Sequence, residues 1–195
     1  MTIAIGEKLW IKGDWDKRSV PDGRIPILIH PNMHAYGAGW NPSTKKCLEY
    51  MEFYLAPGAI VLDIGTGSGI LAIAALKLGA SKAIGTDIDL DALQAAKDNA
   101  IANLSGDSLL LLSETYPSLP DATIDIIMSN IGQAASKDYF ARCAKYLKPA
   151  GLFIFSGTTD ELDAYEVQLM QVGLMKIAGE LTTEGLHVLV YQRMG

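Results

Sequence analysis

The sequence predicts an α/β fold: a doubly wound, mostly parallel sheet that ends in an antiparallel hairpin. Three observations support this. From residue 59 onward, short apolar runs alternate with helical runs, which is typical of chains that build a parallel sheet with helices on both faces. A glycine cluster stands where the first apolar run gives way to a helix. The last two apolar runs are joined by a turn alone, so one of their strands must run antiparallel to the others.

The N-terminal residues, 1–40, differ in character from the rest and are rich in Gly, Pro and aromatic residues. Within them, LWIKGDW (9–15) and RIPILIHP (24–31) have the composition of short strands bounded by turns. From Asn41 the pattern becomes helical, because Asn41-Pro42-Ser43-Thr44 can cap a helix that runs through CLEYMEFYL. We expect one domain over 1–195, in which N-terminal strands precede a core over 41–195.

The core begins with AIVLDI (59–64), a continuous apolar run typical of a strand that is buried on both faces. A helix over 68–78 follows and ends at Gly79. KAIGTDI (82–88) predicts the second strand. Asp89 then caps a helix that runs to about Asn103.

The second half of the core repeats this alternation. We expect strands at 107–113, 123–130 and 152–157 and helices at 136–147 and 159–172. The segment Lys148-Pro149-Ala150-Gly151 is expected to end the first of these helices. The final stretch, LMKIAGELTTEGLHVLVYQR, predicts two strands that pair as a hairpin around the turn Thr183-Glu184-Gly185.

Bulk properties disfavour several classes of function. The formal net charge of −6 and the pI near 5.0 argue against a nucleic-acid surface. The three histidines and two cysteines show no metal-ligand spacing, so we expect no metal site. The amino terminus lacks a signal-peptide pattern, and no apolar run approaches the ~20 residues that span a bilayer. We expect a soluble, cytoplasmic protein with no membrane partner.

The glycine cluster Gly65-Thr66-Gly67-Ser68-Gly69 indicates a nucleotide-type ligand, because glycines allow a tight turn and close approach of a ligand to the backbone. Its spacing is GxGxG, whereas the dinucleotide fingerprint is GxGxxG. Asp63 stands two residues before the first glycine, where a carboxylate would repel a pyrophosphate and would suit a cationic amino-acid group. Asp87 ends the second strand, at the position where a carboxylate can accept hydrogen bonds from two ribose hydroxyls. Together these residues point to S-adenosyl-L-methionine.

The segments LDIGTGSGILAIAALKLGA, GTDIDLDALQAAKDNA and YLKPAGLFIFSG resemble the class I S-adenosylmethionine-dependent methyltransferases, over nearly the whole chain. Residues 35–44 partly match the pattern AFGTGxHPTT, and Asn130-Ile131-Gly132 partly matches NIL, of the ribosomal protein L-eleven methyltransferase (PrmA-type) family. This resemblance implies a seven-stranded, Rossmann-like methyltransferase sheet. It also implies N-methylation of an amine, on a protein or on a small molecule.

The resemblance also implies roles for particular residues. Glycines of the loop would contact the methionine portion of the cofactor. Asp87 would hold the ribose, Ile88 would lie against the adenine, and Ser113 or Glu114 would lie near the adenine edge. The full set of cofactor-binding residues that we expect is Thr44, Asp63, Gly65, Thr66, Gly67, Asp87, Ile88, Ser113, Glu114 and Asn130.

Asn130 is our candidate catalytic residue. Its amide carbonyl can orient an attacking amine, and it stands at the carboxyl end of a strand, where open parallel sheets bind their ligands. His34, Tyr36 and Trp40 precede the first core helix. They could form a cofactor lid within residues 1–40 or could pack a small N-terminal subdomain.

Three departures from the family pattern leave alternatives open. Ala38 and Asn41 stand where the family has Thr and His, and the family's separate substrate-recognition domain is not expected in this chain. The alternatives are a small-molecule methyltransferase or a cofactor-binding domain without transfer activity. A NAD-dependent oxidoreductase is a remote alternative, disfavoured by GxGxG, by Asp63 and by the terminal hairpin.

Overall fold

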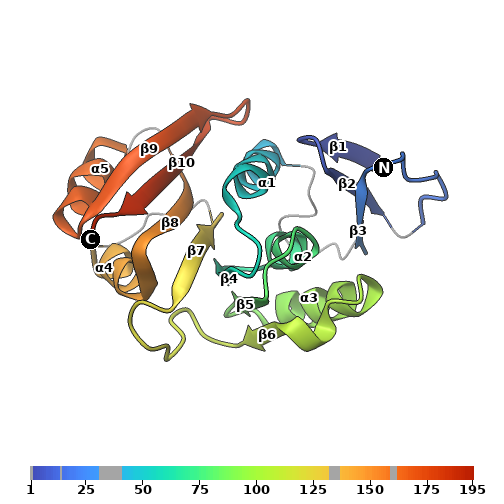
Figure 1. Cartoon of the computed structure of the whole chain (residues 1–195), viewed down its shortest axis with the longest axis horizontal. Helices are drawn as coiled ribbons and strands as arrows, with labels where there is room; N and C mark the ends of the chain where they lie inside the picture. The colour runs from blue at the N-terminus through green and yellow to red at the C-terminus, as the bar shows by residue number, and fades with distance from the viewer. Residues whose placement is uncertain (1, 14, 31–40, 132–136, 159–161) are drawn as a thin grey trace.

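The computed structural model describes residues 2–13, 15–30, 41–131, 137–158 and 162–195. A seven-stranded sheet has the order β6-β5-β4-β7-β8-β10-β9 (Figure 1). Its strands are β4 (Ile60–Ile64), β5 (Lys82–Thr86), β6 (Leu109–Leu112), β7 (Ile124–Ser129), β8 (Leu147–Thr158), β9 (Leu174–Leu181) and β10 (Leu186–Arg193). β10 is antiparallel to both of its neighbours, and the pairs from β6 to β8 are parallel. The predicted fold class is confirmed.

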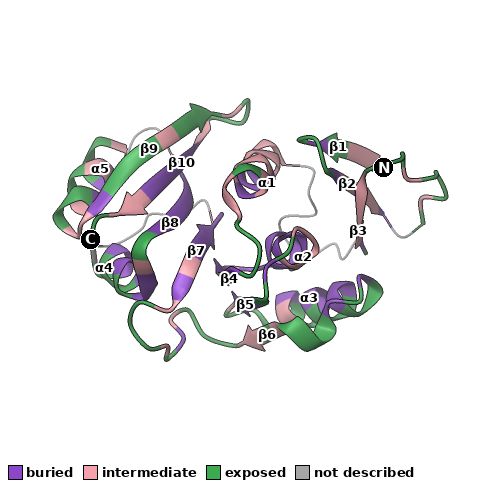
Figure 2. Ribbon diagram, viewed as in Figure 1, coloured by how far each residue is buried: buried purple, intermediate pink, exposed green. Residues whose placement is uncertain are grey.

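Helices cover both faces of this sheet. On one face lie α1 (Pro42–Tyr54), α2 (Ile70–Lys77) and α3 (Leu90–Ala102), and on the other lie α4 (Lys137–Tyr146) and α5 (Leu162–Gln171). Two apolar cores result, because alternate side chains of a strand point to opposite faces. Val61 joins the core under α1 and α2, whereas Leu62 joins the core under α4 and α5. The central strands are buried and the outer helix faces are exposed (Figure 2).

A short three-stranded sheet precedes α1. It consists of β1 (Thr2–Ile5), β2 (Leu9–Gly13) and β3 (Ile25–Ile29), with β1 antiparallel and β3 parallel to β2. The strands predicted within 9–15 and 24–31 are present, and β1 was not anticipated. Buried isoleucines of this sheet pack in the same core as α1 and α2. His34, Tyr36 and Trp40, predicted to form a lid or to pack an N-terminal subdomain, lie outside the described residues, as does Ala38.

The junction of α4 and β8 corrects one prediction. Leu147 was expected to close a helix, but it begins β8 and pairs with Ile124. The next pair is Ile126 with Leu152, so the Lys148–Gly151 segment bulges out of the strand instead of ending a helix. Ala150 has a φ of 62°, which bends the chain at this point. The Pro-Ala-Gly run indicated the end of a helix because the same residue types also occur in strand bulges.

The N-terminus of α1 is capped differently from the expectation. Asn41 occupies the cap position with extended backbone, but its side chain makes no cap hydrogen bond. The backbone amide of Ser43 donates instead to Glu184 Oε1 at 2.8 Å, from the turn between β9 and β10. The start of α1 is thereby tied to the C-terminal hairpin.

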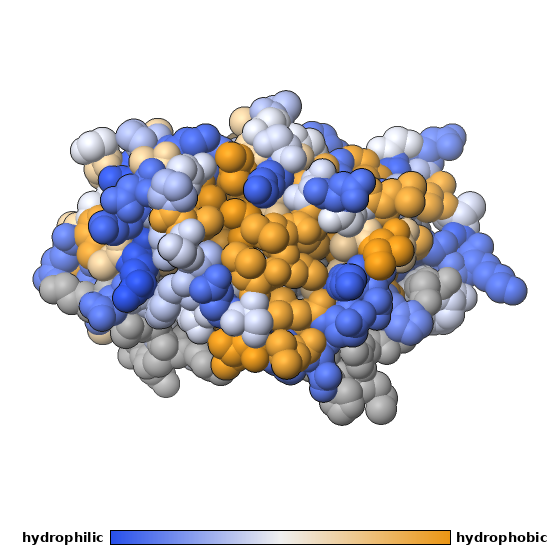
Figure 3. Space-filling view, turned by 90° about the horizontal axis from the view of Figure 1, so that it is seen from below, coloured by the Kyte–Doolittle hydropathy of each residue, from blue (hydrophilic) through white to orange (hydrophobic). Residues whose placement is uncertain are grey.

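The surface has a marked apolar area on the side where β6 and α3 lie, seen from below in Figure 3. Exposed apolar residues of this part of the chain include Leu90, Ile101, Leu104 and Leu110. In the described part of the chain, none of the helices has both the length and the apolar character needed to cross a membrane.

Candidate functional site

A cavity of about 460 Å³ opens at the carboxyl ends of β4, β5 and β7. This is the edge where open parallel sheets bind ligands. Its walls come from the start of α1, the loop after β4, the ends of β5 and β7, and the segment after β6. The lining residues are Thr44, Ile64, Gly65, Thr66, Gly67, Ile70, Leu71, Thr86, Asp87, Ile88, Asp89, Ala92, Glu114, Thr115, Asn130 and Ile131.

The glycine loop turns β4 into α2 around the floor of this cavity. Gly65, Gly67 and Gly69 have φ values of 71°, 54° and 78°, a region that residues with a Cβ rarely occupy. The backbone amides of Gly65 and Thr66 both donate to the carbonyl oxygen of Thr86, each at 2.8 Å. The end of β5 therefore holds the loop in place, and the loop backbone lines the cavity.

Asp87 lies at the rim, directly after β5. Its Oδ2 accepts from the amide of Gly67 at 3.0 Å, and its Oδ1 accepts from the amide of Asp89 at 3.0 Å. Each carboxylate oxygen retains a second lone pair, so the oriented carboxylate can still accept bonds from ligand hydroxyls. Ile88 follows with its side chain 77% exposed, an apolar surface at the mouth of the cavity.

Asp63 lies behind the loop and forms no part of the cavity wall. It is 1% exposed, because it points to the same face of β4 as Val61, which α1 and α2 cover. Its Oδ2 accepts from the hydroxyl of Thr66 at 2.7 Å, and its Oδ1 has no hydrogen-bond partner among the described residues. Burial raises the pKa of Asp63 to about 6, and the nearby charge of Asp87 acts in the same direction. Near neutral pH a buried negative charge thus stands behind the loop, where it favours a cationic ligand.

Asn130 and Thr44 form a buried pair at the other end of the cavity. Asn130 follows β7, and its Nδ2 donates to Thr44 Oγ1 at 2.9 Å across 86 residues of sequence. Asn130 Oδ1 is buried and has no partner among the described residues. An oriented acceptor without a donor, in the wall of a cavity, can accept a hydrogen bond from a ligand amine.

The remaining candidates divide between the wall and the surface. Glu114 lines the cavity, whereas Ser113 is exposed and lies outside its wall. Sequence reasoning missed Thr86, whose hydroxyl is buried without a partner among the described residues. Its place at the end of β5, directly before Asp87, was the available signal. Ile131 was also missed, although its side chain covers Gly65.

Gly65→Ala tests how tightly the loop is built. An added Cβ would lie 2.2 Å from Cγ2 of Ile131 at a φ of 71°, so the loop or Ile131 must move. We expect a loss of about 1–3 kcal/mol in unfolding free energy and at least a tenfold loss of cofactor affinity, measured by denaturant unfolding and calorimetric titration. Gly173→Ala is the matched control, because its φ is 80° and no atom of the described residues lies within 4 Å of the new Cβ. Equal effects of the two changes on affinity would contradict this reading.

Comparisons with known proteins identify the family of this chain. A family model described as ribosomal protein L11 methyltransferase (PrmA) matches residues 2–176. The ribosomal protein L11 methyltransferase of Aliivibrio salmonicida is 39% identical over 159 residues, covering 81% of this chain and 53% of that protein. That of Azotobacter vinelandii is 37% identical over 183 residues, covering 94% and 61%. The chain thus spans about half the length of the curated relatives it matches.

Solved structures give the same result. A ribosomal protein L11 methylase from Lactobacillus delbrueckii subsp. bulgaricus superposes with a TM-score of 0.88 at 27% identity, covering 100% of this chain and 99% of that one. A Burkholderia thailandensis N1-methyltransferase with bound S-adenosylhomocysteine shares the fold, with a TM-score of 0.64 at 17% identity over 78% of this chain and 79% of that one. On the family match and these relatives, the chain belongs to the ribosomal protein L11 methyltransferase (PrmA) family.

Proposed function

We propose that this chain binds S-adenosyl-L-methionine and catalyses transfer of its methyl group to an amine of a protein. The observation that carries the proposal is the buried Oδ1 of Asn130, which has no partner among the described residues, in the wall of a cavity that also presents the glycine loop and Asp87. Because the matched relatives are named for ribosomal protein L11, we propose a ribosomal protein of this type as the acceptor, met in the cytoplasm.

The residues of the cavity fit the two ends of this cofactor. Asp87 would accept from the ribose hydroxyls, and Ile88 would pack on the adenine. The loop backbone would contact the methionine portion, with the charge of Asp63 behind it. When bound, S-adenosylmethionine supplies a methyl group on a positively charged sulfur, which an amine takes by in-line displacement.

The protein contributes alignment and exclusion of water. An amine must be neutral to attack, and Asn130 Oδ1 would accept a hydrogen bond from one of its N–H groups and so direct its lone pair. The bond from Asn130 Nδ2 to Thr44 holds this acceptor in one orientation. Since an amide cannot take up a proton near neutral pH, Asn130 only orients the amine; the methylated amine carries the extra proton and loses it to solvent after it leaves the cavity.

Calorimetric titration with S-adenosylmethionine, S-adenosylhomocysteine and NAD tests the ligand class. We expect both adenosyl compounds to bind and NAD not to bind. At ~100 times the dissociation constant, binding should add about 2.7 kcal/mol to the unfolding free energy, seen as a higher melting temperature. Binding of NAD alone would overturn the proposal.

Methyl transfer itself is tested with labelled S-adenosylmethionine and two sets of acceptors, purified ribosomal protein L11 and a panel of small amines. Label in the protein supports the proposed acceptor, and label in a small amine alone replaces it with a small-molecule substrate. Binding without transfer to either set would leave a cofactor-binding domain, the alternative raised by Asn41 and Ala38.

A further inference from the structure

One face of α3 runs from the cavity to the edge of the small N-terminal sheet. It is formed by Ala92, Ala96, Asn99 and Asn103, whose spacings of three and four residues place them in one row along the helix. All four are buried. Ala92 lines the cavity, and Ala96 lies against the glycine loop, where a Cβ on Gly69 would come within 3.0 Å of its Cβ. The two asparagines continue the row beyond the cavity.

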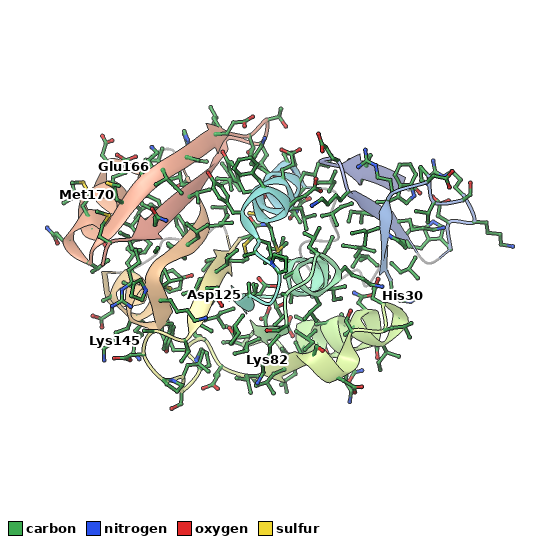
Figure 4. The ribbon with its side chains drawn as sticks, in the orientation of Figure 1. His30, Lys82, Asp125, Lys145, Glu166 and Met170 are labelled. Carbon is green, nitrogen blue, oxygen red and sulfur yellow. The ribbon has the colours of Figure 1, made fainter. Side chains whose placement is uncertain are left out.

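Asn99 makes two hydrogen bonds that join separate parts of the fold. Its Nδ2 donates to the carbonyl oxygen of Ser68, within the glycine loop, at 2.8 Å. Its Oδ1 accepts from the backbone amide of His30 at 2.8 Å. His30 directly follows β3 and lies beside α3 (Figure 4). One amide group therefore links the ligand-binding loop to the end of β3.

Asn103 lies in the same row of α3 but does not bond to the glycine loop. Its Oδ1 accepts from the amide of Leu28 at 2.9 Å, and its Nδ2 donates to the carbonyl of Leu28 at 2.7 Å. Its Nδ2 also donates to the carbonyl oxygen of Asn99, one turn earlier in the helix, at 2.8 Å. Both asparagines thus cover the edge of β3 that faces away from β2, but only Asn99 also bonds to the glycine loop.

The burial of Asn99 makes this link stiff. The residue is 1% exposed, so water cannot easily replace either partner, and breaking one bond leaves a buried polar group without a partner. Movement of either the Ser68 carbonyl or the edge of β3 would therefore break a hydrogen bond of the same buried amide and raise the free energy of the folded chain. Gly67 and Gly69 flank Ser68, so the part of the loop that Asn99 holds adjoins the backbone in the cavity wall.

We propose that Asn99 is a positioning residue that couples the glycine loop to the edge of β3. Ligand binding in the cavity should make local opening of this edge rarer. Because coupling between two sites is reciprocal, loss of the Asn99 hydrogen bonds should in turn lower the affinity for the ligand. The identity of the ligand, an adenosyl compound, rests on the proposed function.

The first test needs no mutation. Hydrogen exchange of the His30 amide is followed by NMR in the wild-type chain, with and without saturating S-adenosylhomocysteine. We expect exchange to slow about tenfold or more on binding. If the chain binds the compound and the exchange rate of His30 does not change, the coupling is wrong while the proposed function stands. If the chain binds neither adenosyl compound, the proposed function fails, and the coupling to this ligand fails with it.

Variants then separate the two bonds. Asn99→Ala removes both and should lower affinity for S-adenosylhomocysteine about tenfold. Asn99→Asp in its ionised form, measured at mildly alkaline pH, keeps an acceptor for His30 but cannot donate to Ser68, so it should lose affinity while keeping slow exchange at His30. Asn103→Ala, the matched control, should speed exchange at Leu28 and leave affinity within about twofold. A folded Asn99→Asp chain with wild-type affinity would overturn the assignment.

Discussion

Asn130→Ala is expected to lower the rate of methyl transfer about 100-fold while changing the affinity for S-adenosylhomocysteine less than about threefold. The substitution removes Oδ1, the buried acceptor that has no partner among the described residues, and leaves the glycine loop and Asp87 intact. The measurement is a steady-state rate with the acceptor that the transfer assay identifies, together with calorimetric affinity on the same preparation.

Thr44→Val tests how much the fixed orientation of the Asn130 amide contributes to the rate, apart from the presence of its acceptor oxygen. Valine keeps the shape of threonine but cannot accept the bond that Asn130 Nδ2 donates at 2.9 Å. We expect a smaller loss of rate than in Asn130→Ala, because the acceptor remains and only its orientation is released. Equal losses of rate and affinity in Asn130→Ala would assign the residue a structural role.

Asp63→Asn is expected to stabilise the chain near neutral pH and to weaken cofactor binding. Asparagine is close in shape to aspartate and can still accept from Thr66 through its amide oxygen. It removes a charge that burial disfavours. The cost of that charge follows from the pKa of Asp63, which burial raises from 3.8 to about 6.

The raised pKa of Asp63 makes the stability of the folded chain depend on pH. Between about pH 4 and pH 6 the folded chain holds a proton on Asp63 that the unfolded chain has lost, so the stability that this group contributes falls as pH rises through that window. The loss amounts to as much as about 3 kcal/mol above pH 6. Chemical denaturation at pH 4, 5, 6 and 7 should show this fall in the wild type and a flatter profile in Asp63→Asn.

Binding should change in the opposite direction. Affinity for S-adenosylmethionine should fall in the wild type below pH 6, as Asp63 becomes protonated, and should be low in Asp63→Asn at every pH. Asp91→Asn is the control for net charge, because Asp91 is an exposed acid in the first turn of α3. Undiminished affinity in Asp63→Asn would show that the charge behind the loop does not contribute to binding.

Residue types and spacing within short segments were enough to predict most of the strands, turns and helix starts. The apolar run 59–64 and the glycines after it predicted a buried strand and a tight turn, and both are present in β4 and the loop before α2. Asp89 was predicted to cap a helix, and its carboxylate accepts from the amide of Asp91 at 2.9 Å. These features depend on residues within a few positions of one another, so the sequence alone determines them.

Hydrogen bonds and strand pairing between residues far apart in the sequence could not be predicted from local patterns. Asn130 and Thr44 were each expected among the cofactor-binding residues, but their hydrogen bond spans 86 residues and follows from the packing of α1 over the sheet. The cap of α1 comes from Glu184 and not from Asn41 for the same reason. The parallel pairing of β2 with β3 likewise depends on the core that both strands share with α1 and α2.

Asp63 shows most clearly which properties can be predicted from the sequence and which depend on the tertiary structure. Its position before the glycines identified it as an acid near a ligand, and its identity as a carboxylate indicated a cationic partner. Only the fold determined that it is sealed behind the loop, with a raised pKa and one oxygen unpartnered among the described residues. The sequence by itself determined which residues reach this edge of the sheet, because strand ends and turns are local. The tertiary structure decided which of them face the cavity, because burial and hydrogen bonding depend on the elements packed around each side chain.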